Sequence, residues 1–110
     1  MDMYAALAEP TRRNILELLA NSGQMSASEI ANKFHTSPPA ISQHLKILRE
    51  AKLVAMEKRA QQRIYTLNPL SIKEMEAWIH KLGKLWDERF SALDKLLEEE
   101  KKKWKGGEKK

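Results

Sequence analysis

The chain has 110 residues, of which 42% are hydrophobic and 32% charged, a composition typical of a folded domain and not of a disordered chain. It contains no cysteine, which excludes disulfides, thiolate metal sites and cysteine nucleophiles. Residues 1–13 lack the basic start and the continuous apolar stretch of a signal peptide, and no run of about 18 apolar residues occurs elsewhere. We therefore expect a cytoplasmic protein with no membrane partner.

Positive charge is concentrated in the middle of the chain. The net charge is +5, and residues 37–65 carry six Lys and Arg against two Asp and Glu. Residues 1–36 carry three against four, and residues 66–110 carry eleven against nine. A short basic segment suits a polyanionic partner, because Lys and Arg displace counterions from phosphates. Charge alone does not distinguish such a segment from a solvated basic surface.

Two helices are expected before residue 24. Residues 4–9 suit a short first helix that is interrupted near Pro10. Pro10 suits the first position of a second helix, because its missing N–H would have no partner there. That helix is expected over about residues 10–21, with apolar side chains recurring at Ile15, Leu18 and Leu19.

A third, short helix follows a break at residues 24–26. Ser26 and Glu29 fit a capping box, in which each side chain accepts a hydrogen bond from the other residue's backbone N–H. The helix is expected over residues 27–34. Residues 35–37 then form a tight turn, so the next helix begins abruptly.

The next helix is expected from Ser37 to Ala51. Ser37 suits its N-cap, and Pro38 and Pro39 suit its first positions. One face carries an apolar stripe of Ile41, Leu45 and Leu48, and the opposite face carries Pro39, Gln43, Lys46 and Glu50. Two helices joined by a turn of this length fit a helix-turn-helix, although such turns also occur in proteins that bind no nucleic acid.

A basic hairpin strengthens the nucleic-acid interpretation. Residues 53–59 and 62–67 alternate apolar with polar side chains around a turn at residues 60–61. Arg59, Gln62 and Arg63 lie near its tip, from which they could reach a minor groove or phosphates. Leu53 and Tyr65 are better explained as hairpin core. The sequence predicts a mainly α winged helix-turn-helix, with about five helices and a two-stranded wing.

The last helix is expected from a cap at Ser71 to residue 103. At 1.5 Å per residue, roughly 30 residues span about 45 Å, longer than a domain of this size is wide. Its apolar seam steps by three or four residues through Met75, Ile79, Leu82, Trp86, Phe90, Leu93 and Leu97, and Trp78 and Leu85 widen it. The earlier helices are too few and short to cover this seam, which predicts a symmetric dimer. We place the domain at residues 1–103 and a disordered basic tail at residues 104–110.

Four segments carry a family resemblance: LAEPTRRNILELLA, SASEIANKF, SPPAISQHLKILREAKLV and the hairpin end RIYTLN. Together they resemble the ArsR-type winged-helix repressors, and among them the metal-independent, autorepressor-like branch. The similarity covers residues 3 to about 97. The resemblance implies a homodimer formed by the first and last helices, which binds double-stranded DNA at an inverted-repeat operator and blocks transcription.

The resemblance also implies residue roles. The expected DNA contacts on the recognition helix are Ser37, Pro39, Ala40, Ser42, Gln43 and Lys46. Gln43 suits adenine, and Lys46 suits phosphate or guanine. His44 lies beside the apolar stripe, which favours a packed histidine, with a phosphate contact as its functional alternative. The expected dimer contacts are Tyr4, Leu7, Met75, Trp78, Ile79, Leu82, Trp86, Phe90 and Leu93.

The sequence departs from the family in three places. The helix over residues 27–34 lacks the cysteine pair of metal-sensing members, so no metal or other cofactor is expected. Lys52 stands where relatives commonly have glycine, at a cost of up to about 1 kcal/mol if φ is positive there. The wing turn also lacks glycine, which leaves the direction of Arg59 and Arg63 open.

Three other functions compete with a simple repressor. A zinc- or ligand-responsive sensor could use Glu76, His80 and Asp87 of the last helix, although scattered ligands on a charged helix are usually surface residues. A protein-interaction module would have no reason to keep a basic segment at residues 37–65. An enzyme is the weakest alternative, because no catalytic triad, carboxylate pair or phosphate-binding glycine pattern occurs. The residues do not identify a small-molecule effector.

Overall fold

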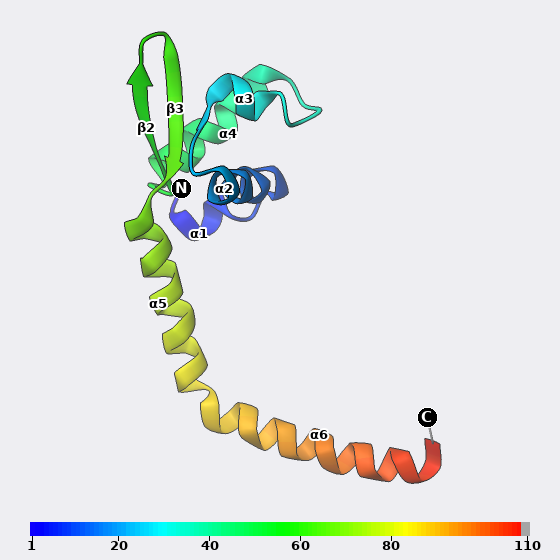
Figure 1. The fold of residues 1–110 in the computed structure, drawn as a ribbon. Coiled ribbons are helices and arrows are strands. Elements are labelled where there is room, and N and C mark those ends of the chain that lie inside the picture. The colour runs from blue at the N-terminus through cyan, green and yellow to red at the C-terminus, as the bar shows by residue number, and fades with distance from the viewer. Residues whose placement is uncertain (109–110) are drawn as a thin grey trace. The chain divides into compact units, whose positions relative to one another are not determined.

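The fold divides into two units, Met1–Glu74 and Met75–Lys110. The structure is a computed structural model that describes residues 1–108, without the side chains of residue 88, residues 90–92 and residues 102–108. The first unit contains helices α1 to α4, a small sheet and the start of α5, and the second contains the rest of α5 and α6 (Figure 1). The predicted mainly α, winged helix-turn-helix fold is confirmed.

Helices α1 (Met3–Ala6) and α2 (Pro10–Ser22) both begin at an acidic cap. The Asp2 carboxylate accepts from the Ala5 N–H at 2.7 Å, and the Glu9 carboxylate accepts from the Thr11 and Arg12 N–H groups at 2.6 and 3.2 Å. Desolvation raises the pKa of Glu9, but these two donations and the neighbouring His44 outweigh it, so the pKa lies below its ordinary value. The predicted second helix is confirmed.

The first helix is shorter than the predicted 4–9. After Ala6 the chain tightens, because the N–H groups of Leu7 and Ala8 bond to carbonyls three residues back instead of four. This tight turn ends α1 and leads into the Glu9 cap.

The capping box of α3 (Ala27–Ala31) is confirmed. The Ser26 Oγ accepts from the Glu29 N–H at 3.1 Å, and the Glu29 Oε1 accepts from the Ser26 N–H at 2.8 Å. The helix ends at Ala31, sooner than the predicted Phe34, because the N–H groups of Lys33 and Phe34 bond to carbonyls three residues back.

Helix α4 (Pro38–Glu50) matches its prediction. The Ser37 Oγ accepts from the Ala40 N–H at 3.3 Å, and Pro38 and Pro39 occupy the first two positions. Its apolar stripe of Ile41, Leu45 and Leu48 lies at the centre of the core, each member at most 1% exposed. Beside it lie fully buried side chains of α2, α3 and the chain after α4: Ile15, Leu19, Ile30 and Leu53. Burial of each such side chain contributes roughly 1.5–3 kcal/mol, so the stripe fastens α4 to the domain.

The sheet has three strands in the order β1-β3-β2, one more than the predicted wing. Strand β1 (Met25–Ser26) pairs antiparallel with β3 (Gln62–Leu67), placing Met25 opposite Tyr65 and Ser26 opposite Ile64. The segment 24–26, predicted to be only a break, is therefore also the third strand. Two residues are too few to show the alternation that identifies a strand from sequence.

The predicted hairpin is confirmed, with β2 (Val54–Arg59) paired to β3 and its turn at Ala60 and Gln61. In Figure 1 the hairpin lies beside the helices of the first unit, with its turn at the end away from α1. Ala60 has φ of +54°, a conformation that an L-residue other than glycine adopts at a cost of about 1–2 kcal/mol. The absence of glycine thus leaves the two-residue turn intact but strained.

A second positive φ, +65° at Lys52, ends α4 in a Schellman motif. The Leu53 N–H bonds to the Leu48 carbonyl and the Lys52 N–H to the Arg49 carbonyl, both at 3.0 Å. Leu48 and Leu53, which the motif brings together, are both fully buried. The condition on which the cost at Lys52 depended, a positive φ, is therefore met.

The start of α5 (Pro69–Leu85) is fastened to this same turn. The Lys52 carbonyl accepts from the Asn68 Nδ2 at 2.9 Å and from the Ser71 hydroxyl. The predicted cap at Ser71 is wrong: Asn68 caps the helix, because its Oδ1 accepts from the Leu70 N–H at 3.1 Å, and Ser71 lies inside the first turn. Ser71 is buried, and its hydroxyl is used for the tertiary contact.

The predicted single last helix is interrupted at Trp86, where α5 ends and α6 (Asp87–Glu108) begins. Gly83 weakens the helix before the break, and Asp87 places a negative charge at the favourable N-terminal position of α6. The Arg89 guanidinium lies 4.8 Å from the centre of the Trp86 ring, a cation–π contact across the break.

Helix α6 continues past residue 103, so residues 104–108, expected in a disordered tail, are helical. None of the described helices is long and apolar enough to cross a membrane.

The strain at Lys52 predicts that Lys52→Gly raises the free energy of unfolding by about 0.5–1 kcal/mol, because glycine adopts a positive φ without a Cβ clash. Urea denaturation followed by circular dichroism measures the change. Lys52→Ala is the matched control and should give no increase, because alanine keeps the Cβ. An equal gain for both variants would show that the lysine side chain, and not the backbone, causes the cost.

Candidate nucleic-acid interface

The exposed face of α4 borders a hollow of about 300 Å³. Five of the predicted DNA contacts line it: Pro39, Ser42, Gln43, Lys46 and, from β3, Arg63. The two cations and the Gln43 amide are exposed, and no carboxylate in the described part of the chain pairs with Lys46 or Arg63. The structure thus brings the polar face of α4 and one residue of the wing to a single concave surface, which we call the α4 hollow.

The floor of the α4 hollow is part of the hydrophobic core. Leu45 and Tyr65 line it and are 1% and 5% exposed. Tyr65 is buried as predicted, and its strand also pairs with β1, which fixes the distance between the wing and the helix-turn-helix. The hollow therefore rests on packed side chains, and its shape does not depend on a loose loop.

Arg49 also lines the α4 hollow, although it was not among the predicted DNA contacts. It lies one helical turn after Lys46 and two turns after Ser42, at the i, i+4, i+7 spacing of a shared face. Extending the polar face by one turn would have found it. With Arg49, the hollow has three cations around one glutamine amide.

The two arginines of the wing lie on opposite faces of the hairpin. Arg63 pairs with Lys58 across the strands and shares a face with Tyr65, which lines the α4 hollow. Arg59 pairs with Gln62 on the other face. Only Arg63, of the three predicted wing contacts, is brought to the hollow. Lys58 was not predicted, and its place follows from the two-residue turn, because turn length fixes hairpin register.

Arg59 is held by neighbours on its own face. Its Nη2 lies 3.1 Å from the Glu57 Oε1, in an ion pair, and 3.3 Å from the Gln24 Oε1. Both partners of the ion pair are at least half exposed, so the pair adds little to stability. The sequence left open which way the Arg59 side chain points, and the structure shows that it points along the wing toward Gln24.

Ser37, Ala40 and His44 lie outside the α4 hollow. The Ser37 oxygen accepts from the Ala40 N–H as the helix cap, and Ala40 is half-buried. His44 is also half-buried, with its Nδ1 3.3 Å from the Nη1 of Arg12 in α2. The packed interpretation of His44 thus agrees with the structure, which places it on the α2 side of α4.

The predicted dimer contacts are mostly exposed. In the first unit, Tyr4 is 42% exposed and Leu7 half-buried. In the second unit, Met75 is half-buried, the Phe90 side chain lies outside the described residues, and the exposed members are Trp78, Ile79, Leu82, Trp86 and Leu93. Leu85, Leu96 and Leu97 are exposed as well, and Leu96 was missed because it lies beside the seam. So much exposed apolar surface on two helices is unusual for a protein that works alone.

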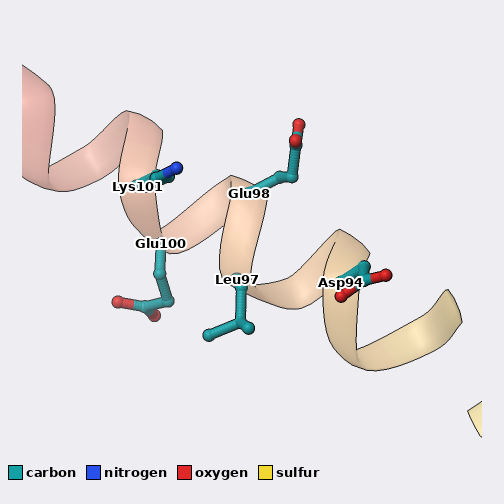
Figure 2. Close-up of a pocket in the computed structure, with 5 residues that line it drawn as sticks. All are labelled: Asp94, Leu97, Glu98, Glu100 and Lys101. Atoms are coloured by element: carbon teal, nitrogen blue, oxygen red, sulfur yellow. The ribbon is translucent and has the colours of Figure 1, made fainter. Parts of the chain in front are cut away.

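Farther along α6, apolar and charged side chains share one surface depression. It is lined by Asp94, Leu97, Glu98, Glu100 and Lys101. Figure 2 shows Leu97 and Glu100 on one side of the helix and Glu98 on the other. The apolar seam therefore becomes mixed with carboxylates toward the end of α6.

The residues weighed as zinc ligands on the last helix are Glu76, His80 and Asp87. Among the residues that the structure describes, no three His, Asp or Glu side chains come together in a way that could hold a metal ion. Glu76 and His80 belong to α5, whereas Asp87 begins α6 after the break at Trp86.

Comparison with known proteins identifies the family. Residues 9–55 match the family described as bacterial regulatory protein, arsR family. The chain is 37% identical over 78 residues to the transcriptional repressor SdpR of Bacillus subtilis, covering 71% of this chain and 86% of that protein. It is 34% identical over 97 residues to the HTH-type transcriptional regulator Rv2034 of Mycobacterium tuberculosis, covering 88% of this chain and 87% of the relative.

Solved structures agree with these relatives. An ArsR-like transcriptional regulator from Rhodococcus sp. RHA1 superposes with a TM-score of 0.69 at 29% identity, covering 84% of this chain and 87% of the other. A possible transcriptional regulator for arsenical resistance gives a TM-score of 0.68 at 37% identity, covering 76% and 85%. These proteins are regulators and not enzymes. The resemblance is confirmed: the chain belongs to the ArsR family of bacterial transcriptional regulators.

Proposed function

We propose that the chain is a homodimeric repressor that reads an inverted-repeat operator, with α4 in the major groove and the wing against the adjacent backbone. The observation that carries the proposal is the α4 hollow, which unites Gln43, Lys46 and Arg63 on one surface. SdpR, a relative along most of its length, is named a transcriptional repressor. A rigid surface with cations around an amide suits a groove whose walls are phosphates and whose floor carries base edges.

Within this proposal, the side chains of α4 divide between base edges and phosphates. The Gln43 amide offers a donor and an acceptor, which match the N7 and N6 positions of adenine. Ser42, one position earlier, donates or accepts at a neighbouring base or phosphate. Lys46 and Arg49 lie one and two turns farther along the same face, toward the end of the helix, and suit the phosphate backbone. At the start of α4, the backbone would approach the DNA closely at Ser37, Pro39 and Ala40.

The wing contributes mainly through Arg63 and Lys58. Both lie on the face of the hairpin that turns toward the α4 hollow, so they extend its positive charge along the duplex. Arg59 and Gln62, on the other face, make an additional contact once a phosphate replaces Glu57 as the partner of Arg59. The exchange is inexpensive, because an exposed ion pair of this kind contributes at most about 1 kcal/mol.

The dimer of the proposal uses the exposed apolar side chains of α5 and α6, together with those of α1. Ile79 is 58% exposed and Leu82 39% exposed, one turn apart on α5. A second copy of the chain would cover this seam by helix packing. Two copies also place two α4 helices on one duplex, which is what an inverted-repeat operator requires.

The positive charge of the α4 hollow predicts DNA binding that weakens steeply with salt. Lys46→Ala and Arg63→Ala should each weaken binding to all sequences and lower the slope of log K against log salt by about 0.9, the value for one phosphate contact. Fluorescence anisotropy with a labelled duplex at several salt concentrations measures both. Lys95→Ala, which removes the same charge from α6, is the control and should leave affinity and slope unchanged.

The Gln43 amide leads us to predict that the chain prefers particular DNA sequences. Gln43→Ala should cost about 1–3 kcal/mol at one base pair of each half-site and leave non-specific binding intact. Selection of genomic fragments by parent and variant, followed by sequencing, shows which position loses its preference. If the double variant Gln43→Ala/Arg63→Ala bound the selected duplex as well as the parent does, α4 and the wing would not be the DNA-binding surface.

The exposed seam of α5 predicts a dimer that one charge can dissociate. Ile79→Glu should shift the chain toward monomer in sedimentation, because it buries a carboxylate among apolar side chains. Ala77→Glu adds the same carboxylate to an exposed position on the other side of α5 and should leave the dimer intact. Equal dissociation by both variants, or a monomeric parent, would be inconsistent with this interface.

A further inference from the structure

A buried arginine connects α1, α2 and the recognition helix. Arg12, in the first turn of α2, is only 7% exposed. Its Nε donates to the Ala6 carbonyl of α1 at 2.7 Å, its Nη1 lies 3.3 Å from the Nδ1 of His44 in α4, and its Nη2 contacts the Met1 sulfur at 3.8 Å. No carboxylate in the described part of the chain forms an ion pair with it. The charge of Arg12 is thus directed at α1 and α4.

We propose that Arg12 is a positioning residue of the DNA interface, which fixes the His44 ring as its neutral, Nε2-protonated tautomer. This inference rests on the proposed DNA-binding function. It assigns a role to a side chain that lies outside the α4 hollow and is buried in the domain.

The tautomer follows from the chemistry of the two side chains. A guanidinium has only donors, so a hydrogen bond with His44 requires an unprotonated Nδ1 that accepts. A neutral ring with an accepting Nδ1 carries its proton on Nε2. A protonated ring would have no acceptor for Arg12 and would place a second cation 3.3 Å from the first. The Glu9 carboxylate, at the cap of α2, is an acidic group near the same ring.

The fixed tautomer matters because His44 belongs to the recognition helix. The ring is half-buried, so part of it remains accessible beside the apolar stripe of α4. With Nδ1 engaged, Nε2–H is the one donor that the ring can offer to a phosphate oxygen. A donor held in place before binding loses less entropy on contact than one that must first be ordered. Arg12 therefore acts on DNA binding through His44.

The first experiment reads the tautomer directly in the DNA-free protein. Long-range ¹⁵N–¹H spectra of the imidazole rings distinguish the Nδ1–H, Nε2–H and protonated states, and His44→Gln identifies the signal among the three histidines. We expect His44 to be neutral with Nε2–H at pH 7 in the parent, and Arg12→Met to mix the tautomers or protonate the ring. A parent ring with Nδ1–H, or a charged one, would overturn the proposal without any reference to DNA.

The second experiment measures binding to a duplex of random sequence, since a phosphate contact needs no operator. Arg12→Met should weaken binding about 3- to 10-fold, as expected for one hydrogen bond, with the salt slope unchanged because Arg12 neutralises no phosphate. Arg13→Met is the matched control: it removes an exposed arginine from the next position, which donates to the Leu7 carbonyl and not to His44. The control should bind within about twofold of the parent.

A double-variant cycle separates action through His44 from loss of structure. If Arg12 acts through His44, Arg12→Met/His44→Gln binds no more weakly than His44→Gln alone. Additive losses, or equal losses for Arg12→Met and Arg13→Met, would contradict the role. Arg12→Lys, which keeps the charge and a donor, should restore part of the affinity if Arg12→Met folds poorly. A parent that fails to bind any duplex would refute the proposed function, while the tautomer would still test the Arg12–His44 contact.

Discussion

The carbonyl of Lys52 is the point on which the winged unit depends. It accepts from Asn68 and Ser71 at the start of α5, while the positive φ of the same residue closes the Schellman motif that ends α4. Helix α4, Leu53 just before the hairpin and the beginning of α5 are thereby joined within a single turn. A left-handed residue is required, because any other backbone direction would separate α4 from Leu53 and the sheet.

Most of the helical elements are predictable because their signals are local. The capping box at Ser26, the cap at Ser37 and the apolar stripe of α4 each need only a few consecutive residues, and each is found as expected. Strand β1, the Asn68 cap and the break at Trp86 are not local in this way. A two-residue strand depends on its partner β3, and Ser71 serves Lys52 from 19 residues away instead of capping its own helix. Sequence patterns do not contain these tertiary choices.

The residues of the candidate site also divide into those with a local sequence signal and those whose place depends on strand pairing. The polar face of α4 is a property of one helix, so Pro39, Gln43 and Lys46 could be named from periodicity, whereas Ser42 was named from the family resemblance. The wing could not be treated in that way, because successive side chains of a strand point to opposite faces, and the turn length sets which residues share a face across the hairpin. Arg59 and Arg63 look equivalent in the sequence, yet only Arg63 reaches the α4 hollow. Turn length and register decide which charge is useful, and both require the pairing to be known.

The positive charge of this chain is therefore not one uniform patch. Arg12 is buried and directed at the core side of α4, Arg59 is paired with Glu57, and Arg49 and Arg63 line the hollow. Arginine suits each of these places for a different reason: its fixed donors reach several acceptors in a buried site, whereas its permanent charge serves at an open surface. A count of charges along residues 37–65 suggests where a polyanion binds, but burial and hairpin register determine which of those charges can meet it.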